Sequence, residues 1–136
     1  MLSKVLRMLK KRLGTEAIES DWYSDEKLTN YFKIPSTLII SEGCREIGKY
    51  AFDEYNKLEK IVIPDSCWKI GYAAFYGCER LKKVEIPKSV EKIREHAFCG
   101  CINATIILRK RKKDFKFGIG SEAFYNVKDV KEEIRS

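Results

Sequence analysis

Residues 70–92 read IGYAAFYGCERLKKVEIPKSVEK, and the same pattern recurs on both sides of them. A gapless copy, IGKYAFDEYNKLEKIVIPDSCWK, precedes them at 47–69, and a shortened copy, IREHAFCGCIN, follows at 93–103. These copies start 23 residues apart. A degraded copy, IGSEAFYNV, begins 26 residues later at Ile119, and the half-copy LIISEGCRE occupies 38–46. Self-similarity of this length is typical of a solenoid, in which each unit buries its apolar face against its neighbours.

Two apolar columns run through the aligned copies. The first consists of Ile47, Ile70, Ile93 and Ile119, and the second of Phe52, Phe75, Phe98 and Phe124. Between them, Ile61-Val62-Ile63 and Val84-Glu85-Ile86 alternate inward, outward and inward, which predicts a short strand ended by Pro64 or Pro87. Stacked strands of this kind form a parallel sheet with a spacing of about 4.8 Å. The Ile-Gly-x-x-Ala-Phe stretch predicts a compact helical or turn segment on the opposite side.

The composite pattern IGxxAFxxCxxLxxVxIPxSVxxIG resembles the BspA-type leucine-rich repeat over residues 38–127. The resemblance implies adhesion and protein recognition with diverse partners. We therefore expect an α/β fold, a short right-handed leucine-rich-repeat solenoid with a parallel sheet of short strands and a 23-residue period. We expect an N-terminal helical cap at 1–33, the solenoid at 34–126 and a C-terminal cap or tail at 127–136, because solenoid ends need atypical capping.

The net charge of +7 is concentrated in two short segments. Residues 34–108 hold 11 Lys or Arg against 10 Asp or Glu, whereas 1–13 hold 5 basic and no acidic residues and 109–116 hold 6 basic and 1 acidic. The first segment has the spacing of an amphipathic helix, which either caps the first repeat or lies on anionic lipid. The second is either a solvated hairpin or a phosphate-binding loop. The side chains that would contact an anionic membrane or nucleic acid are Lys4, Arg7, Lys11, Arg109, Arg111, Lys112 and Lys113.

The sequence contains few residues that could support catalysis or metal binding. The five cysteines are expected to be reduced thiols that fill the core, because Val90 and Tyr55 replace them in their columns. The single histidine, His96, has Cys99 three residues on, but no motif orients the two as a base and a nucleophile. We therefore expect no enzyme, no cofactor, no metal site and no small-molecule substrate. With no secretory signal and no transmembrane segment, the predicted location is cytoplasmic.

The outward positions of the coils indicate a protein-interaction module. One outward column is read as Ile39, Val62, Glu85 and Leu108, with Lys60 and Lys83 beside it. Trp68 and Tyr72 fall in columns otherwise occupied by charged residues, so they either anchor a partner or shield a neighbouring turn. The candidate partner-binding residues are Lys60, Val62, Trp68, Tyr72, Lys83 and Glu85. Binding to a membrane or nucleic acid through the basic segments is the alternative function, and an uncovered solenoid end is a possible site of oligomerisation.

Overall fold

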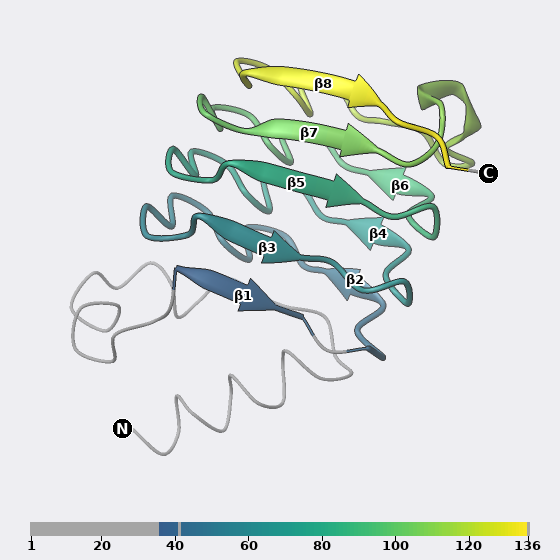
Figure 1. The fold of residues 1–136 in the computed structure, drawn as a ribbon, viewed down its shortest axis with the longest axis horizontal. Helices are drawn as coiled ribbons and strands as arrows, with labels where there is room; N and C mark the ends of the chain where they lie inside the picture. The colour runs from purple at the N-terminus through teal and green to yellow at the C-terminus, as the bar shows by residue number, and fades with distance from the viewer. Residues whose placement is uncertain (1–35, 41, 136) are drawn as a thin grey trace.

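The computed structural model describes residues 36–40 and 42–135, which wind into stacked coils with a parallel strand on each of two sides (Figure 1). On one side lie the longer strands β1 (Thr37–Ile39), β3 (Lys60–Val62), β5 (Lys83–Ile86), β7 (Thr105–Leu108) and β8 (Asp129–Glu132). β1 pairs with β3, and β7 pairs with both β5 and β8. β3 and β5 lie side by side. Every strand pair is parallel, as the repeat predicts.

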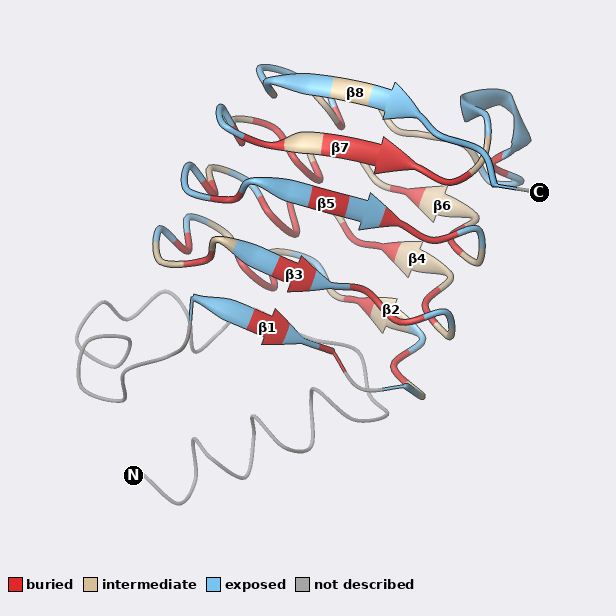
Figure 2. Ribbon diagram, in the orientation of Figure 1, coloured by how far each residue is buried: buried red, intermediate tan, exposed pale blue. Residues whose placement is uncertain are grey.

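The register of this sheet confirms the predicted alternation of side chains. Leu38 pairs with Ile61, and Val84 pairs with Ile106, and all four are buried. Figure 2 shows the buried residues in the middle of β1, β3 and β5, with exposed residues on either side. At β1, β3 and β5 the sheet therefore has an inner face that packs on the core and an outer face that meets solvent.

The outward column differs from the prediction at the fourth strand. Glu85 pairs with Ile107, while Leu108 pairs with Ile86 and is fully buried. The assignment of Leu108 to the outer column was therefore wrong. The chain between β5 and β7 is one residue shorter than the 23-residue period, so β7 enters the sheet one position earlier. A one-residue shift in register moves every side chain of a strand to the other face.

A second parallel sheet occupies the other side of the coils, where the sequence predicted only a helical or turn segment. It consists of the two-residue strands β2 (Glu46–Ile47), β4 (Lys69–Ile70) and β6 (Lys92–Ile93), and Ile119 extends it by a bridge to Ile93. Turns follow these strands. Within the described residues the only helix is the 3-10 turn η1 (Lys112–Asp114), and the predicted helical cap lies outside them.

The phenylalanine column forms a stack through the centre of the molecule. Ring centroids are 5.2 Å apart between Phe52 and Phe75 and 4.9 Å apart between Phe75 and Phe98, and the rings of each pair are stacked nearly parallel. Phe124 continues the stack at 6.0 Å. The first three rings are fully buried, as the repeat predicts. Burying an aromatic ring of this size contributes strongly to stability, because it removes a large apolar area from water.

Each coil turns tightly after its short strand. Two positions in each of these turns have positive φ. In successive coils the first of the two positions is occupied by Tyr50, Ala73, His96 and Glu122. The close approach of adjacent coils explains the glycine at position 71. A Cβ on Gly71 would lie 2.7 Å from backbone atoms of Gly48 and Lys49 in the preceding coil. Only a residue without a side chain allows the two backbones to approach this closely.

The cysteines are free and buried, which confirms the prediction that they are reduced and fill the core. The Cys78 thiol donates a hydrogen bond to the carbonyl oxygen of Phe52, and Cys101 repeats this contact with Phe75, each at 3.0 Å. Burial raises the pKa of Cys67 to about 12. A protonated thiol that donates to a backbone carbonyl thus occupies the interior without an unsatisfied donor.

The last strand lies in the segment predicted as a C-terminal cap or tail. β8 covers the outer edge of β7, and the Glu133 amide extends the pairing with a hydrogen bond of 2.9 Å to the Leu108 carbonyl oxygen. In the described part of the chain, no helix has the length and hydrophobicity that a membrane span requires.

Candidate functional site

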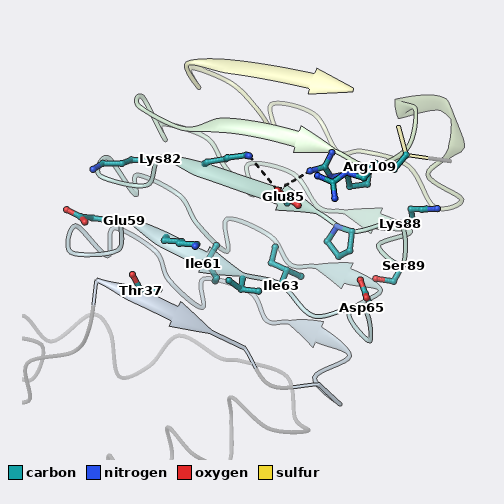
Figure 3. A pocket seen from close by; sticks show the side chains of 15 residues that line it. Thr37, Glu59, Ile61, Ile63, Asp65, Lys82, Glu85, Lys88, Ser89 and Arg109 are labelled. Atoms are coloured by element: carbon teal, nitrogen blue, oxygen red, sulfur yellow. Dashed lines mark ion pairs between the residues drawn. The ribbon is translucent and has the colours of Figure 1, made fainter. Parts of the chain in front are cut away.

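Four of the six predicted partner-binding residues lie together on the outer face of the long-stranded sheet. Lys60 and Val62 project from β3, and Lys83 and Glu85 project from β5, because all four occupy outward positions of the strand alternation. They line a groove of about 1020 Å³ (Figure 3). Its position across two adjacent coils follows from the repeat, since equivalent side chains stack above one another.

The groove combines apolar surface with a charged rim. Val62 is 39% exposed within the groove. Ile39, at the same outward position on β1, is 67% exposed but does not line the groove. Pro87 also lines the groove. The charged lining residues comprise six Lys or Arg and three Asp or Glu. An apolar centre with a polar rim is the usual composition of a protein-binding surface.

Arg109 closes one end of the groove. Its side chain is only 9% exposed. Its Nη2 lies 3.0 Å from Glu85 Oε1 (Figure 3), and its Nη1 lies 3.3 Å from Glu133 Oε2. The Arg109 guanidinium holds the pKa of Glu85 below its usual value. The sequence analysis assigned Arg109 to a basic loop. In the structure Arg109 follows β7 directly, and its amide donates a hydrogen bond of 3.2 Å to the Ile86 carbonyl oxygen. The 23-residue period gave no signal for this position, because the loop before β7 is one residue shorter.

Trp68 and Tyr72 lie away from this groove, and both are half-buried. Trp68 packs edge to face on Phe117. Tyr72 packs edge to face between Tyr50 at 5.5 Å and His96 at 5.6 Å, and it lines a smaller groove of about 530 Å³ beside the short strands. The structure therefore does not bring the six predicted residues into one site, and it supports the interpretation that the two rings shield neighbouring turns.

Three of the six basic side chains in segment 109–116 form ion pairs within the described residues, and Arg109 is one of them. Lys110 Nζ lies 2.9 Å from Glu91 Oε1 and 4.7 Å from the centroid of the Phe115 ring. Arg111 Nε lies 2.9 Å from Asp114 Oδ2. The side chains of Lys112 and Lys113 are exposed and form no ion pair with a described residue. The other predicted anion-binding residues, Lys4, Arg7 and Lys11, lie outside the described residues.

The histidine and its neighbouring cysteine do not form an activated pair. His96 Nδ1 lies 3.3 Å from Glu122 Oε2. Burial, together with the negative charge of Glu122, raises the pKa of the Cys99 thiol, so this group is protonated at neutral pH. The thiolate is the nucleophilic form of cysteine. The described residues also contain no cluster of three side chains that suits a metal ion.

Comparison with protein families agrees with this geometry. The BspA type leucine rich repeat region matches residues 16–134 in six copies. The chain belongs to the BspA-type leucine-rich repeat family. The match begins within the segment predicted as an N-terminal cap and extends through β8. No curated protein and no solved structure shows a significant match.

Membership of this family bears on function at a general level. Leucine-rich repeats generally mediate protein interactions and are typically non-catalytic. The repeat supplies a constant core, and the residues that vary around it determine what an individual member binds. The relevant features of this BspA-type protein are therefore its outward side chains rather than its columns of isoleucine and phenylalanine.

Proposed function

We propose that this chain is a non-catalytic protein-interaction module whose partner contacts the outer face of β1, β3 and β5. The observation that supports this proposal is the groove over β3 and β5, where Val62 is exposed beside Lys60 and Lys83. A partner that buries Val62 removes apolar area from water, while the lysines define its orientation. Leucine-rich repeats generally bind proteins, which agrees with this assignment.

The proposed site excludes Trp68 and Tyr72, in contrast to the grouping predicted from the sequence. Both rings make intramolecular aromatic contacts, and neither lines the groove. A partner would therefore bury Val62 without contacting either ring. This separation gives the proposal a clear test, because substitutions at the two places should have different effects.

The test is affinity capture from the source cells with the full chain as bait. Val62→Glu introduces a charge at the proposed centre, and the sheet already accepts Glu85 on the neighbouring strand. Tyr76→Glu is the matched control, because Tyr76 is 40% exposed but does not line the groove. We expect Val62→Glu to abolish capture of a protein that Tyr76→Glu and wild type retain. Equal capture by all three baits would contradict the proposal.

The alternative function, binding to a membrane or nucleic acid, predicts a different outcome. Its described candidates are Lys112 and Lys113, since Arg109 and Arg111 form ion pairs with carboxylates of the chain. Binding of that kind falls steeply with salt because it depends on counterion release. Retention on vesicles of anionic lipid or on RNA at physiological salt, lost in a Lys112→Glu, Lys113→Glu double variant, would favour it over the groove.

A further inference from the structure

The groove carries positive charge that the described chain does not neutralise. Lys60, Lys82 and Lys88 line it, and all three are exposed. None of them forms an ion pair with a described residue. Lysine side chains that surround a concavity raise the local concentration of anions, because their fields add within it.

The carboxylates of the groove are too few to neutralise its basic side chains. Glu85 is held by Arg109 at 3.0 Å and by Lys83 at 3.6 Å, so its charge is already compensated. The other two carboxylates, Glu59 and Asp65, lie toward opposite ends of the groove (Figure 3). Lys82 lies at the same end as Glu59 and Lys88 at the same end as Asp65, so the lysines are spread along the rim (Figure 3). The lining as a whole keeps an excess of six Lys or Arg over three Asp or Glu.

The uncharged part of the lining favours a polypeptide over a nucleic acid. Val62 is 39% exposed and provides an apolar contact that a partner side chain can cover. Of the described residues that line the groove, none is aromatic. Proteins that bind single-stranded nucleic acid combine a basic groove with aromatic rings on which bases stack. Aliphatic surface between lysines instead matches an aliphatic side chain between carboxylates.

We propose that this groove binds an acidic polypeptide segment, with one aliphatic side chain against Val62 and flanking carboxylates on Lys60, Lys82 and Lys88. This inference rests on the proposed function and specifies the chemistry of its partner. Contact occurs through side chains, since Lys60 and Val62 project from the outer face of β3. Exposed ion pairs of this type contribute modestly one by one, so the aliphatic contact and several lysines must act together.

The experiment measures binding of short fluorescent peptides to the full-length protein by anisotropy. The probe has a central leucine flanked by glutamates. One control peptide has lysines in place of the glutamates, and a second has serine in place of the leucine. A single-stranded RNA of equal charge tests the competing class of ligand. We expect the acidic leucine peptide to bind more tightly than all three, and its affinity to fall as salt is raised.

Charge-reversal variants of the groove lysines test where the acidic peptide binds. We expect Lys60→Glu and Lys82→Glu each to weaken binding of the acidic peptide about fivefold, because reversal replaces an attraction with a repulsion. Lys113→Glu makes the same charge change in the basic segment outside the groove and should alter affinity less than twofold, about the smallest change that such a titration resolves. Circular dichroism with heating checks that each variant is folded. These substitutions affect exposed side chains, so they should leave the fold intact.

Several results would overturn the inference. Tighter binding of the RNA, equal binding of the lysine peptide, or an equal loss with Lys113→Glu would each show that the groove does not select an acidic segment. If no acidic peptide binds while Val62→Glu still abolishes capture of the cellular partner, the partner chemistry is wrong but the proposed function stands. If Val62→Glu affects neither measurement, both proposals fail.

Discussion

Phe117 packs edge to face against Trp68, with ring centroids 6.1 Å apart and ring planes inclined by 74°. The two residues belong to different coils, and Phe117 lies in the inserted segment, within residues 107–120, that precedes the last repeat. The Phe117 amide also donates a hydrogen bond of 2.8 Å to the Glu91 carbonyl oxygen, which fixes this segment against the preceding coil. Trp68 thus supports the inserted segment, while Phe117 remains 55% exposed.

This pair gives a first prediction about stability. We expect Trp68→Ala to lower the free energy of unfolding by about 1–2 kcal/mol, because a half-buried ring loses its contact. Phe117→Ala should cost less than about 1 kcal/mol, since its ring is mostly exposed. A double-mutant cycle in urea should give a coupling of about 0.5–1 kcal/mol. Additive effects of the two substitutions would show that the rings do not interact in solution.

The phenylalanine stack predicts a much larger effect. Phe75 lies between Phe52 and Phe98 and is fully buried, so Phe75→Ala should destabilise the protein by about 3–5 kcal/mol. Its neighbour Tyr76 is 40% exposed, and Tyr76→Ala should cost less than about 1 kcal/mol. Thermal and urea unfolding of both variants measure the difference. Similar stabilities would mean that the two rings are not on opposite sides of the chain.

The close approach of adjacent coils predicts a steric effect at Gly71. A Cβ there would lie 2.7 Å from backbone atoms that cannot move aside, so Gly71→Ala should cost about 2 kcal/mol or more. Gly118 is the control. A Cβ at that position has no neighbour within 4 Å, but its φ of 83° is unfavourable for alanine. Gly118→Ala should therefore cost about 1 kcal/mol from backbone strain alone. Equal losses would argue against close contact between the coils.

The Arg109 ion pairs predict a dependence of stability on pH. Arg109 lowers the pKa of Glu85 from its usual value of 4.5. A carboxyl group whose pKa is lower in the folded state stabilises the fold above the unfolded pKa, and this contribution is lost as pH falls through the folded pKa. We expect Arg109→Met to cost about 1 kcal/mol at pH 7, a modest value because Glu85 is half exposed.

The difference between wild type and Arg109→Met should shrink as the pH is lowered below 4.5. Urea unfolding of both proteins between pH 7 and about pH 3 measures this difference in stability. Lys83→Met is the control. Lys83 Nζ lies 3.6 Å from Glu85 Oε1, but both side chains are exposed, so this substitution should change the free energy of unfolding by less than about 0.5 kcal/mol. A cost of Arg109→Met that stays constant with pH would show that packing, rather than charge, accounts for the role of Arg109.

The sequence was sufficient to predict the core of the fold. The alternation in Ile61-Val62-Ile63 and Val84-Glu85-Ile86 predicted the long strands. The recurrence of phenylalanine at 52, 75 and 98 predicted the buried stack. The short strands of the second sheet were missed, because two residues are too few to show an alternation. The position of Leu108 was missed as well, since a single shortened loop carries no pattern that reveals its length.

The candidate site was only partly predictable, for a physical reason that Trp68 illustrates. Its column is otherwise charged, which correctly indicates a position at the surface, but its exposure depends on Phe117 in a non-repeating segment. Arg109 is similar, because its burial depends on Glu133 in the last coil. Repetition predicts contacts within the repeat, whereas contacts with an insertion require the three-dimensional structure.

The most direct test of the proposed binding face is photocrosslinking of a captured partner from a defined position. Val62 and Tyr76 have nearly equal exposures of 39% and 40%, and only Val62 lines the groove. Each is replaced in turn by a photoreactive phenylalanine derivative in the full chain, and the complexes are irradiated at physiological salt. We expect a crosslinked product from position 62 and none from position 76. Crosslinking from position 76 but not from position 62 would place the partner elsewhere and contradict the assignment of the groove.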